Sequence, residues 1–387
     1  MNRAPVIAGL GITEMGKVYG RTAPEFAAEA VRLAAADAGL DLRQVDGLLT
    51  NTGLSGDVGL GLQRDLGLRE LRLLSEVQAY GSSAGAMVQY AAMAVASGMA
   101  DVVACVFADA PLKDPSSGAG AAYAGAGRVP SGWQGLAAAS GIYSANTMYA
   151  LAARRHMRRY GTTSEQLGHI AVAQRAWATR NPRAQMREPI TLEDHQNSRW
   201  IAEPFHLLDC CLVSNGGVAV IVTSADRAAD LAQPPVHIRG WAQAHPGYVM
   251  GRGSEFGLVS GAARSGPAAL KMAGVSLSDI DVVELYDCYT FTVLISLEDY
   301  GFCAKGEGGP FVAGGVLGPE GSLAVNTGGG QLSSYYMWGM TPLSEAVIQA
   351  RGQGGERQAP RHDMVLVSGN GGVLDHHSTL ILSPHAR

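Results

Sequence analysis

The chain has 387 residues, of which 47% are hydrophobic and only 16% are charged. This composition excludes a disordered chain, and the length predicts about two or three domains. A formal net charge of −5 argues against a nucleic-acid-binding protein, which would show a basic face.

Cysteine usage and apolar runs indicate a reduced location. The five cysteines include no CxxC pair, which argues against a disulfide framework and against a metal site. The N-terminus lacks the long apolar run of a signal peptide. The most apolar stretch, residues 84–108, is interrupted by Gln89, Gly98 and Asp101, so it predicts a buried helix and a strand. We expect a cytoplasmic protein without a membrane span.

Two halves of the chain repeat the same order of segments. Each half opens on a short apolar strand led by proline, at Pro5 and Pro235. An alanine-rich helix follows and ends in the similar segments 38–46 and 273–281, each of which precedes an apolar run. Helices alternating with short apolar strands predict parallel βαβ units with helices on both faces. The alternative is that Ala/Gly-rich helices resemble one another through composition alone.

The segment between the halves has a different character. It begins with the Gly/Ala/Ser-rich residues 116–126 and continues with a basic helix that has four arginines within residues 154–159. These arginines form either a solvated helix face or a contact for phosphate groups. We expect an inserted cap over the first half. The predicted domains are an N-terminal half, the cap and a C-terminal half, at residues 1–110 with 217–233, 111–216 and 234–387.

Six motifs in the same order resemble those of sterol-carrier-protein-type thiolases. They are residues 155–167, 181–194, 209–217, 284–289, 326–330 and 368–372. The resemblance covers nearly the whole chain. It implies an α/β protein with a thiolase-like five-layer α/β/α/β/α fold, built from two similar halves with an inserted loop domain, which agrees with the repeat.

The residues that give thiolases their chemistry are replaced. A thiolase needs a cysteine thiolate that becomes acylated, a histidine that activates it, and a second cysteine that moves the α-proton. The resemblance places Tyr80, or Gly81 if the alignment slips by one, at the nucleophile and Ser368 at the second cysteine. Tyr336 and Tyr286 stand at two histidine positions. We therefore do not expect thiolysis or condensation through an acyl-enzyme.

Tyrosine can exchange a proton with an alcohol when neighbouring groups stabilise the phenolate. Retro-aldol cleavage of a β-hydroxyacyl-CoA needs such a step and passes through the same thioester enolate as thiolysis. We predict Tyr286 and Tyr336 as the acid/base pair, with Tyr248 as a third candidate and Tyr335 as a substitute for Tyr336. The alternative is that each is a buried aromatic residue with a satisfied hydroxyl.

The residues predicted to contact the substrate or its CoA moiety are Asn326, Ser368, His245, Arg155 and the backbone of Gly371 and Gly372. Residues 375–377, Asp-His-His, follow the Gly-rich turn as a base or metal candidate, although a structural or solvent-facing role is the commoner reading. No other spacing suggests a metal site. Cys288 and Cys303 are interpreted as buried small residues.

Within the superfamily, the chain resembles the lipid-transfer-protein aldolases of steroid side-chain degradation. The resemblance implies cleavage of a 17-hydroxy steroid acyl-CoA to a ketone plus propionyl-CoA or acetyl-CoA, with no cofactor, because the CoA thioester is the substrate. It also implies a homodimer through the first half, near Ser82 and Ser83, and an OB-fold/zinc-ribbon partner that completes a heterotetramer. The alternatives are a non-catalytic CoA- or lipid-binding subunit and an acyltransferase with a displaced cysteine.

Overall fold

The computed structural model describes residues 3–56, 58–116, 118–122, 132, 135–142, 144–247 and 253–386. The N-terminal half contains β1 (Pro5–Ile12), α1 (Ala23–Ala38), β2 (Gly47–Thr52), α2 (Leu62–Leu66), β3 (Leu73–Glu76), α3 (Ser83–Ser97), β4 (Val102–Asp109), β7 (Gly216–Ser224) and α8 (Ala225–Ala228). The segment between β4 and β7 contains α4 (Gly135–Ala139), α5 (Ala145–Tyr160), α6 (Ser164–Thr179), α7 (Leu192–Asn197), β5 (Trp200–Ala202) and β6 (Phe205–His206). The C-terminal half contains β8 (Val236–Ala244), α9 (Ala262–Ala273), β9 (Val282–Leu285), α10 (Thr290–Tyr300), α11 (Gly308–Ala313), β10 (Ala324–Val325), α12 (Met340–Ala350), β11 (Val365–Gly371) and β12 (His376–Ser383).

The order of the strands confirms the predicted internal repeat. Within the described residues the main sheet runs β10-β9-β11-β12-β8-β1-β7-β4-β2-β3, so the two halves mirror one another about the contact between β8 and β1. These two strands pair antiparallel through Val6 with His237 and Ile7 with Val236. The similarity of the halves therefore extends to their topology and is not a matter of composition.

The sheet is mixed, whereas the sequence predicted parallel units. In the N-terminal half β2 is parallel to β3 and β4, but β7 is antiparallel to both β4 and β1. The C-terminal half repeats this pattern, with β12 antiparallel to β11 and β8. Residues 372–375 connect β11 directly to β12. A link this short can join only antiparallel neighbours, because a parallel crossover needs about a dozen residues or more.

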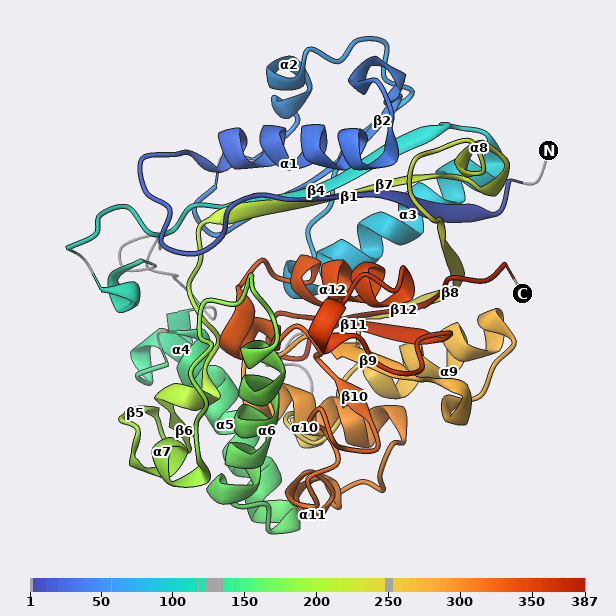
Figure 1. The fold of residues 1–387 in the computed structure, drawn as a ribbon. Helices are drawn as coiled ribbons and strands as arrows, with labels where there is room; N and C mark the ends of the chain where they lie inside the picture. The colour runs from blue at the N-terminus through green and yellow to red at the C-terminus, as the bar shows by residue number, and fades with distance from the viewer. Residues whose placement is uncertain are drawn as a thin grey trace.

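Five layers follow one another through the molecule, as expected for a thiolase-like fold (Figure 1). Helices α1 and α2 cover the outside of the first half-sheet, α3 and α12 lie between the two half-sheets, and α9 with α10 covers the far side. Every residue of β4 is buried. This continuous burial is typical of a strand that helices cover on both faces.

The repeated Ala-Gly pair explains why the first helix of each half ends where it does. Gly39 and Gly274 adopt the left-handed conformation, with φ of 72° and 71°, directly after α1 and α9. Glycine adopts this conformation without a steric penalty, so it is the usual residue after a helix. At the other end of α1, Thr22 and Glu25 form a reciprocal capping box.

The segment between β4 and β7 packs on the C-terminal half, so the predicted position of a cap over the first half is wrong. Helix α6 contacts α10, α11 and the π-helical turn Gly330–Ser334. Two glycines permit this approach, because a Cβ on Gly309 would overlap with the Gln166 side chain and one on Gly329 would lie 2.5 Å from the Cβ of Ala178. The site described next lies where this segment meets the end of the C-terminal half-sheet.

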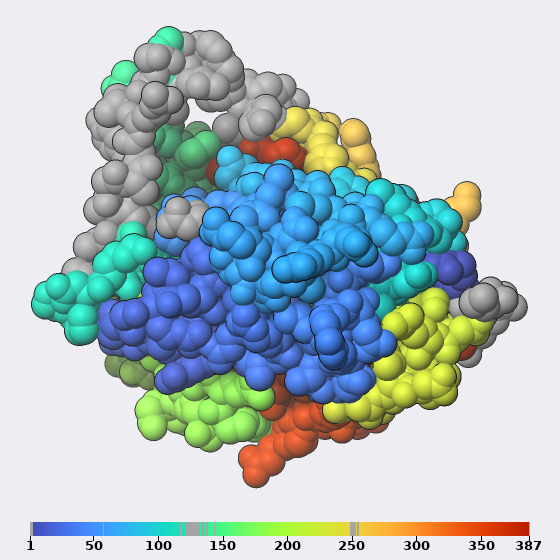
Figure 2. Space-filling model, turned by 90° about the horizontal axis from the view of Figure 1, so that it is seen from above, coloured from blue at the N-terminus to red at the C-terminus, as the bar shows by residue number. Residues whose placement is uncertain are grey.

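The outer surface above α1 belongs almost entirely to the N-terminal half. Viewed from above, its blue and cyan residues cover most of the visible face (Figure 2). Among the helices of the described residues, none combines the length and the apolar character needed to cross a bilayer.

Candidate active site

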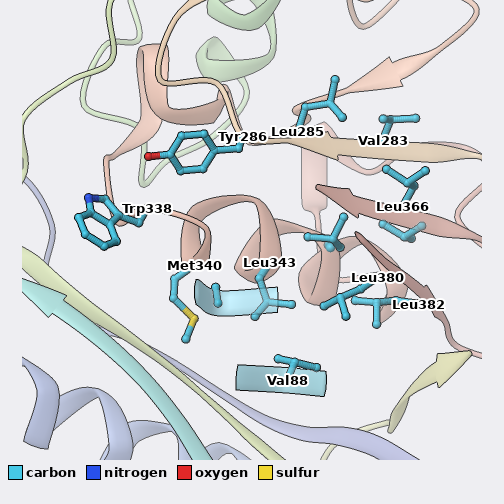
Figure 3. Packing of buried hydrophobic residues seen from close by; sticks show 14 of the residues in the cluster. Val88, Val283, Leu285, Tyr286, Trp338, Met340, Leu343, Leu366, Leu380 and Leu382 are labelled. Atoms are coloured by element: carbon cyan, nitrogen blue, oxygen red, sulfur yellow. The ribbon is translucent and has the colours of Figure 1, made fainter. Parts of the chain in front are cut away.

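Tyr286 and Tyr336 lie side by side with their hydroxyl oxygens 3.2 Å apart. Tyr286 directly follows strand β9, and Tyr336 follows the π-helical turn Gly330–Ser334. The Tyr286 side chain is buried, with 5% exposure, and that of Tyr336 is half-buried. Figure 3 shows the Tyr286 hydroxyl pointing away from the aliphatic core that Leu285 and Val283 join. The structure thus brings together two hydroxyl groups that lie 50 residues apart in the chain.

Gly81 makes room for the Tyr286 ring. A Cβ at position 81 would overlap with Cε2 and Cζ of that ring and with the carbonyl oxygen of Asn370. The Tyr286 backbone N–H donates to the Ser368 carbonyl at 3.0 Å, so the tyrosine cannot move away without breaking the end of the sheet. The turn at the N-terminus of α3 and the end of β9 therefore fix the ring between them.

Gly81→Ala is accordingly expected to displace the Tyr286 ring and to lower activity at least tenfold. The extra methyl overlaps with the Tyr286 ring and with the carbonyl oxygen of Asn370, an overpacking that costs about 1–3 kcal/mol. Steady-state kinetics and chemical denaturation should be measured together. Gly61→Ala is the matched control, because a Cβ there meets nothing within 4 Å. Wild-type kinetics in Gly81→Ala would contradict this account of how Tyr286 is held.

Asp287 holds the turn that carries Tyr336, a role that the sequence analysis missed. Its carboxylate accepts the backbone N–H of Gln331 at 2.9 Å and that of Leu332 at 3.2 Å. A Cβ on Gly330, which has a φ of +59°, would overlap with this carboxylate. Burial raises the pKa of Asp287 to about 7, although the bonds from the two N–H groups oppose that rise. The sequence did offer one indication of this role, because Asp287 directly follows Tyr286 within the motif 284–289.

Ser214 and Gln185 tie the Tyr336 segment to the inserted segment. The Tyr336 backbone N–H donates to Ser214 Oγ at 3.0 Å, and Gln185 Nε2 donates to the same oxygen at 2.7 Å. The Gln185 backbone N–H also donates to the Ser334 carbonyl. Both residues belong to motifs that the family resemblance rested on, so the inserted segment helps to position Tyr336.

Asn326 supports the end of strand β9, next to Tyr286. Its backbone is left-handed, with a φ of +51°, and its Oδ1 accepts the N–H of Leu285 at 2.6 Å. With Asp287 and Glu284 it lines a small cavity of about 10 Å³. A space of that size holds about one water molecule. Burial, together with the charge of Glu345, raises the pKa of Glu284 well above its ordinary value.

Gly371 and Gly372 form the back of the turn before α3. A Cβ on Gly371 would overlap with the carbonyl oxygen of Ala79, so only glycine fits. Gly372 has a φ of +65°, and its carbonyl accepts the Tyr149 hydroxyl at 2.5 Å. The structure therefore places both glycines beside the Tyr80–Ser82 turn (η2), next to Tyr286.

Ser368 lies near Tyr286 through its backbone, but its side chain points to the other face of the sheet. Its hydroxyl is 2.9 Å from His377 Nε2, in a buried cluster with Tyr300. The neighbouring residue Gly369 faces the Gly81 turn, and successive side chains of a strand alternate between faces. Burial lowers the pKa of His377 to about 3, so the imidazole is neutral. The structure does not bring the Ser368 hydroxyl to the tyrosine pair.

A second aromatic group surrounds the exposed side of the Gly81 turn. We define the Tyr80 cluster as Tyr80, Trp338, His245 and His376. The Tyr80 ring stacks on His376 with centroids 6.2 Å apart and lies 6.1 Å from Trp338, and 44% of Tyr80 is exposed. His245 Nδ1 is 3.0 Å from His376 Nδ1. His376 and His377 are consecutive in β12 and point to opposite faces, so residues 375–377 do not act as one cluster.

Of the three remaining predicted residues, Arg155 and Tyr335 lie away from the tyrosine pair. Arg155 is on α5, where its Nη1 donates to the Gly253 carbonyl at 2.8 Å. Tyr248 falls outside the described residues. Tyr335, the substitute for Tyr336, is buried with its hydroxyl 2.7 Å from Ser344 Oγ, in the interior of the C-terminal half.

None of the cysteines has the character of a nucleophile. Burial raises the pKa of every one of the five thiols, to about 12 for Cys288 and about 11 for Cys303. Only a thiolate attacks a thioester efficiently, and these thiols stay protonated near neutral pH. In the described part of the chain, no three His, Cys, Asp or Glu side chains gather into a set that could hold a metal ion.

Comparison with known proteins identifies the family. A family model described as thiolase C-terminal domain-like matches residues 242–384. The steroid side-chain-cleaving aldolase of Thermomonospora curvata is 41% identical over 387 residues, which cover 95% of this chain and 95% of that protein. The chain belongs to the thiolase superfamily. A second superfamily member, the 17-hydroxy-3-oxo-4-pregnene-20-carboxyl-CoA lyase of Mycobacterium tuberculosis, is 39% identical and covers 94% of this chain and 96% of its own length.

Solved structures agree with this membership. A structure described as the Ltp2–ChsH2(DUF35) aldolase superposes with a TM-score of 0.88 at 41% identity and covers 100% of this chain and 99% of that chain. A monomeric SCP2-thiolase-like protein of Mycobacterium smegmatis has a TM-score of 0.78 at 21% identity, which supports the fold alone. The thiolase-like fold expected from the sequence is confirmed.

Proposed function

We propose that this thiolase-superfamily member is a carbon–carbon lyase that cleaves a steroid β-hydroxyacyl-CoA by a retro-aldol reaction. The observation that carries the proposal is the pair of tyrosine hydroxyls 3.2 Å apart on a thiolase scaffold in which burial raises the pKa of all five thiols. Two relatives near 40% identity over almost their full lengths are described as an aldolase and a CoA lyase, which agrees with this chemistry.

The tyrosine pair can move the one proton that the reaction needs. The substrate hydroxyl gives its proton to one tyrosine oxygen, and the Cα–Cβ bond breaks as the ketone C=O forms. The electron pair of that bond becomes the thioester enolate. A proton from the tyrosine pair returns to Cα and completes a short acyl-CoA. The balance is kept by a relay: the tyrosine that accepts the substrate proton passes its own proton to the second tyrosine oxygen, 3.2 Å away, and the second tyrosine gives its proton to Cα. General acid–base catalysis of this kind contributes about 10²–10⁴ in rate.

Measuring the release of the ketone product tests this function. Purified protein is incubated with a 17-hydroxy steroid acyl-CoA, and the ketone and the short acyl-CoA are quantified by liquid chromatography with mass spectrometry. Equal amounts of both products are expected. Intact-mass analysis of the same sample is expected to show no acyl adduct on a cysteine. Failure to cleave the substrate with and without the partner described next would favour a CoA- or lipid-binding subunit instead.

A second copy and a second protein complete the proposed assembly. Helix α3 exposes Tyr90 and Met93, by 40% and 48%, although most of its other side chains are buried, and β3 is an edge strand. Exposed apolar side chains on a helix, and a strand at the edge of the described sheet, are both typical of surfaces that contact another subunit. The structural relative is described as a complex with a DUF35 protein. We therefore propose a homodimer that binds an OB-fold/zinc-ribbon partner, and light scattering with and without that partner measures both associations.

A further inference from the structure

The turn that contacts Tyr286 carries a residue with a strained backbone. Tyr80 has a φ of +51°, in the left-handed region that residues other than glycine seldom adopt. Hydrogen bonds hold it there, because the Tyr80 N–H donates to Gln78 Oε1 at 3.0 Å and Gln78 Nε2 donates to the Thr52 carbonyl at 3.1 Å. Glycine adopts this conformation without a steric penalty, so the backbone alone would favour glycine at position 80.

The Tyr80 side chain is too exposed for burial to explain why the strain is kept. The exposed fraction of the residue is 44%. In the described part of the chain, the other non-glycine residues with a positive φ are Asn326, Trp338 and Leu374, which are buried, and Glu70, which is exposed and charged. Among these five, Tyr80 alone combines a left-handed backbone with an exposed aromatic ring. Strain of this kind is a mark of a functional residue.

The turn formed by Tyr80 and Gly81 contacts both chain segments that carry the tyrosine pair. A Cβ on Gly81 would overlap with the Tyr286 ring, and a Cβ on Gly339 would lie 2.4 Å from the Gly81 carbonyl oxygen. Gly339 follows Tyr336 by three positions in the chain. Because consecutive Cα atoms lie about 3.8 Å apart, the Tyr80 backbone is one residue away from both contacts. The exposed ring therefore starts next to the tyrosine pair.

Neighbouring rings make the Tyr80 ring a supported surface. The Trp338 ring lies 6.1 Å from it between centroids and stacks on Phe107 of β4 at 4.9 Å. The His376 ring lies 6.2 Å from it at an interplanar angle of 15°. Figure 3 shows the Tyr286 hydroxyl directed toward the side on which the Trp338 indole lies. An exposed aromatic ring thus adjoins the tyrosine pair and is joined to the core through Trp338 and Phe107.

The proposed substrate needs an apolar surface at this place. In a 17-hydroxy steroid acyl-CoA, the carbon that carries the hydroxyl is itself a ring carbon, so the fused rings begin at the bond that breaks. When that hydroxyl contacts the tyrosine pair, the rings must lie against side chains next to the pair. An aromatic side chain binds such a skeleton by removing apolar area of both from water, and two rigid surfaces lose little conformational freedom.

We propose that Tyr80 is a specificity-determining residue, whose ring binds the fused apolar rings of the substrate beside the bond that is cleaved. The inference deepens the proposed function and rests on it for the reaction. The strained backbone is then kept because it holds an aromatic ring next to the tyrosine pair, where glycine would leave no side chain. The residue at the expected nucleophile position serves recognition in this chain and takes no part in proton transfer.

Tyr80→Asn removes the ring and keeps a residue that tolerates the left-handed conformation. KM for a 17-hydroxy steroid acyl-CoA is expected to rise about tenfold or more, with kcat changed by less than about twofold, because the lost contact binds the ground and transition states alike. Tyr80→Phe keeps the ring and is expected to show a smaller rise. Glu70→Asn is the matched control, since Glu70 is exposed and left-handed, with a φ of +56°, on the loop between α2 and β3.

Equilibrium dialysis measures the ring contact without the reaction. The two probes are a 17-keto steroid, which is the ketone that the proposed cleavage releases, and propionyl-CoA. Tyr80→Asn is expected to bind the steroid about tenfold or more weakly than wild type, because it lacks the apolar ring, and to bind propionyl-CoA as wild type does. Denaturation curves and light scattering on the same preparations report whether each variant is folded and whether its oligomeric state has changed.

Several results would overturn the inference. One is a wild-type KM and steroid affinity in Tyr80→Asn, or no steroid binding by the wild type. Another is an equal rise of KM in Tyr80→Phe, which would assign the effect to the hydroxyl. A change from dimer to monomer in Tyr80→Asn would make the ring a subunit contact instead. Steroid binding that depends on Tyr80, in a wild-type protein without lyase activity, would refute the proposed function and leave the recognition role standing.

Discussion

Replacing Tyr336 with phenylalanine is expected to lower kcat for ketone release about 10²–10⁴-fold, the contribution of one acid/base group. The change removes a single hydroxyl oxygen that lies 3.2 Å from the Tyr286 hydroxyl and leaves the ring in place. Tyr286→Phe is expected to have an effect of the same order, since either hydroxyl alone cannot share the proton. Steady-state rates of ketone formation, with denaturation curves for each variant, measure both.

Tyr335→Phe is the matched control for this experiment. It removes the same atom from the neighbouring residue, whose hydroxyl bonds Ser344 in the interior instead of facing Tyr286. We expect it to retain activity and to lose about 1 kcal/mol of stability. Full activity in both Tyr336→Phe and Tyr286→Phe would refute the acid/base assignment. A large loss of activity in Tyr335→Phe alone would move the role to that residue.

Replacing Asp287 with alanine is expected to reduce both activity and stability. Its carboxylate satisfies the buried backbone N–H groups of Gln331 and Leu332, and each orphaned donor costs about 1–3 kcal/mol. The free energy of unfolding should therefore fall by roughly 2–5 kcal/mol. Because these two residues belong to the turn that precedes Tyr336, kcat should fall as well. Urea denaturation and ketone-release kinetics on the same preparation measure the two effects.

The raised pKa of Asp287 adds a pH dependence with a definite sign. The folded-state pKa of about 7 lies above the ordinary value of 3.8, so the group's contribution to stability is complete below about pH 4 and is lost as pH rises through 7. Between pH 5 and pH 8 this loss is on the order of 3 kcal/mol. Asp287→Asn cannot ionise, so its destabilisation relative to wild type should be larger at pH 5 than at pH 8. An equal difference at both pH values would show that Asp287 titrates normally.

Local signals were sufficient for the repeat and for the ends of the first helix in each half. Gly39 and Gly274 follow equivalent helices, where a residue with left-handed backbone angles is needed. A glycine after an alanine-rich stretch can be recognised from the local sequence alone. The apolar stretch 84–108 similarly predicted α3 and β4. The prediction of parallel units missed the antiparallel strands β7 and β12, because the apolar character of a strand does not show in which direction it runs through the sheet.

Some residues of the candidate site could also be predicted from local motifs, whereas others could not. Tyr286 and Tyr336 could be chosen from their motif positions, and the structure places them in contact. Asp287 was overlooked, because a carboxylate that serves two backbone N–H groups 44 residues away resembles any other aspartate in sequence. The cap was assigned to the wrong half, because the glycines that admit α6, such as Gly309, lie more than a hundred residues beyond it.

The sequence by itself therefore determined the family, the two-fold repeat and the replacement of the thiolase cysteine and histidine positions by other residues, because each of these depends on residue type and order along the chain. Only the tertiary structure decided that the side chains of Ser368 and His377 face away from the tyrosine pair, while the His376 ring stacks on Tyr80. The physical reason is that neighbouring strand residues point to opposite faces, and which face holds the site depends on the layers that pack against it.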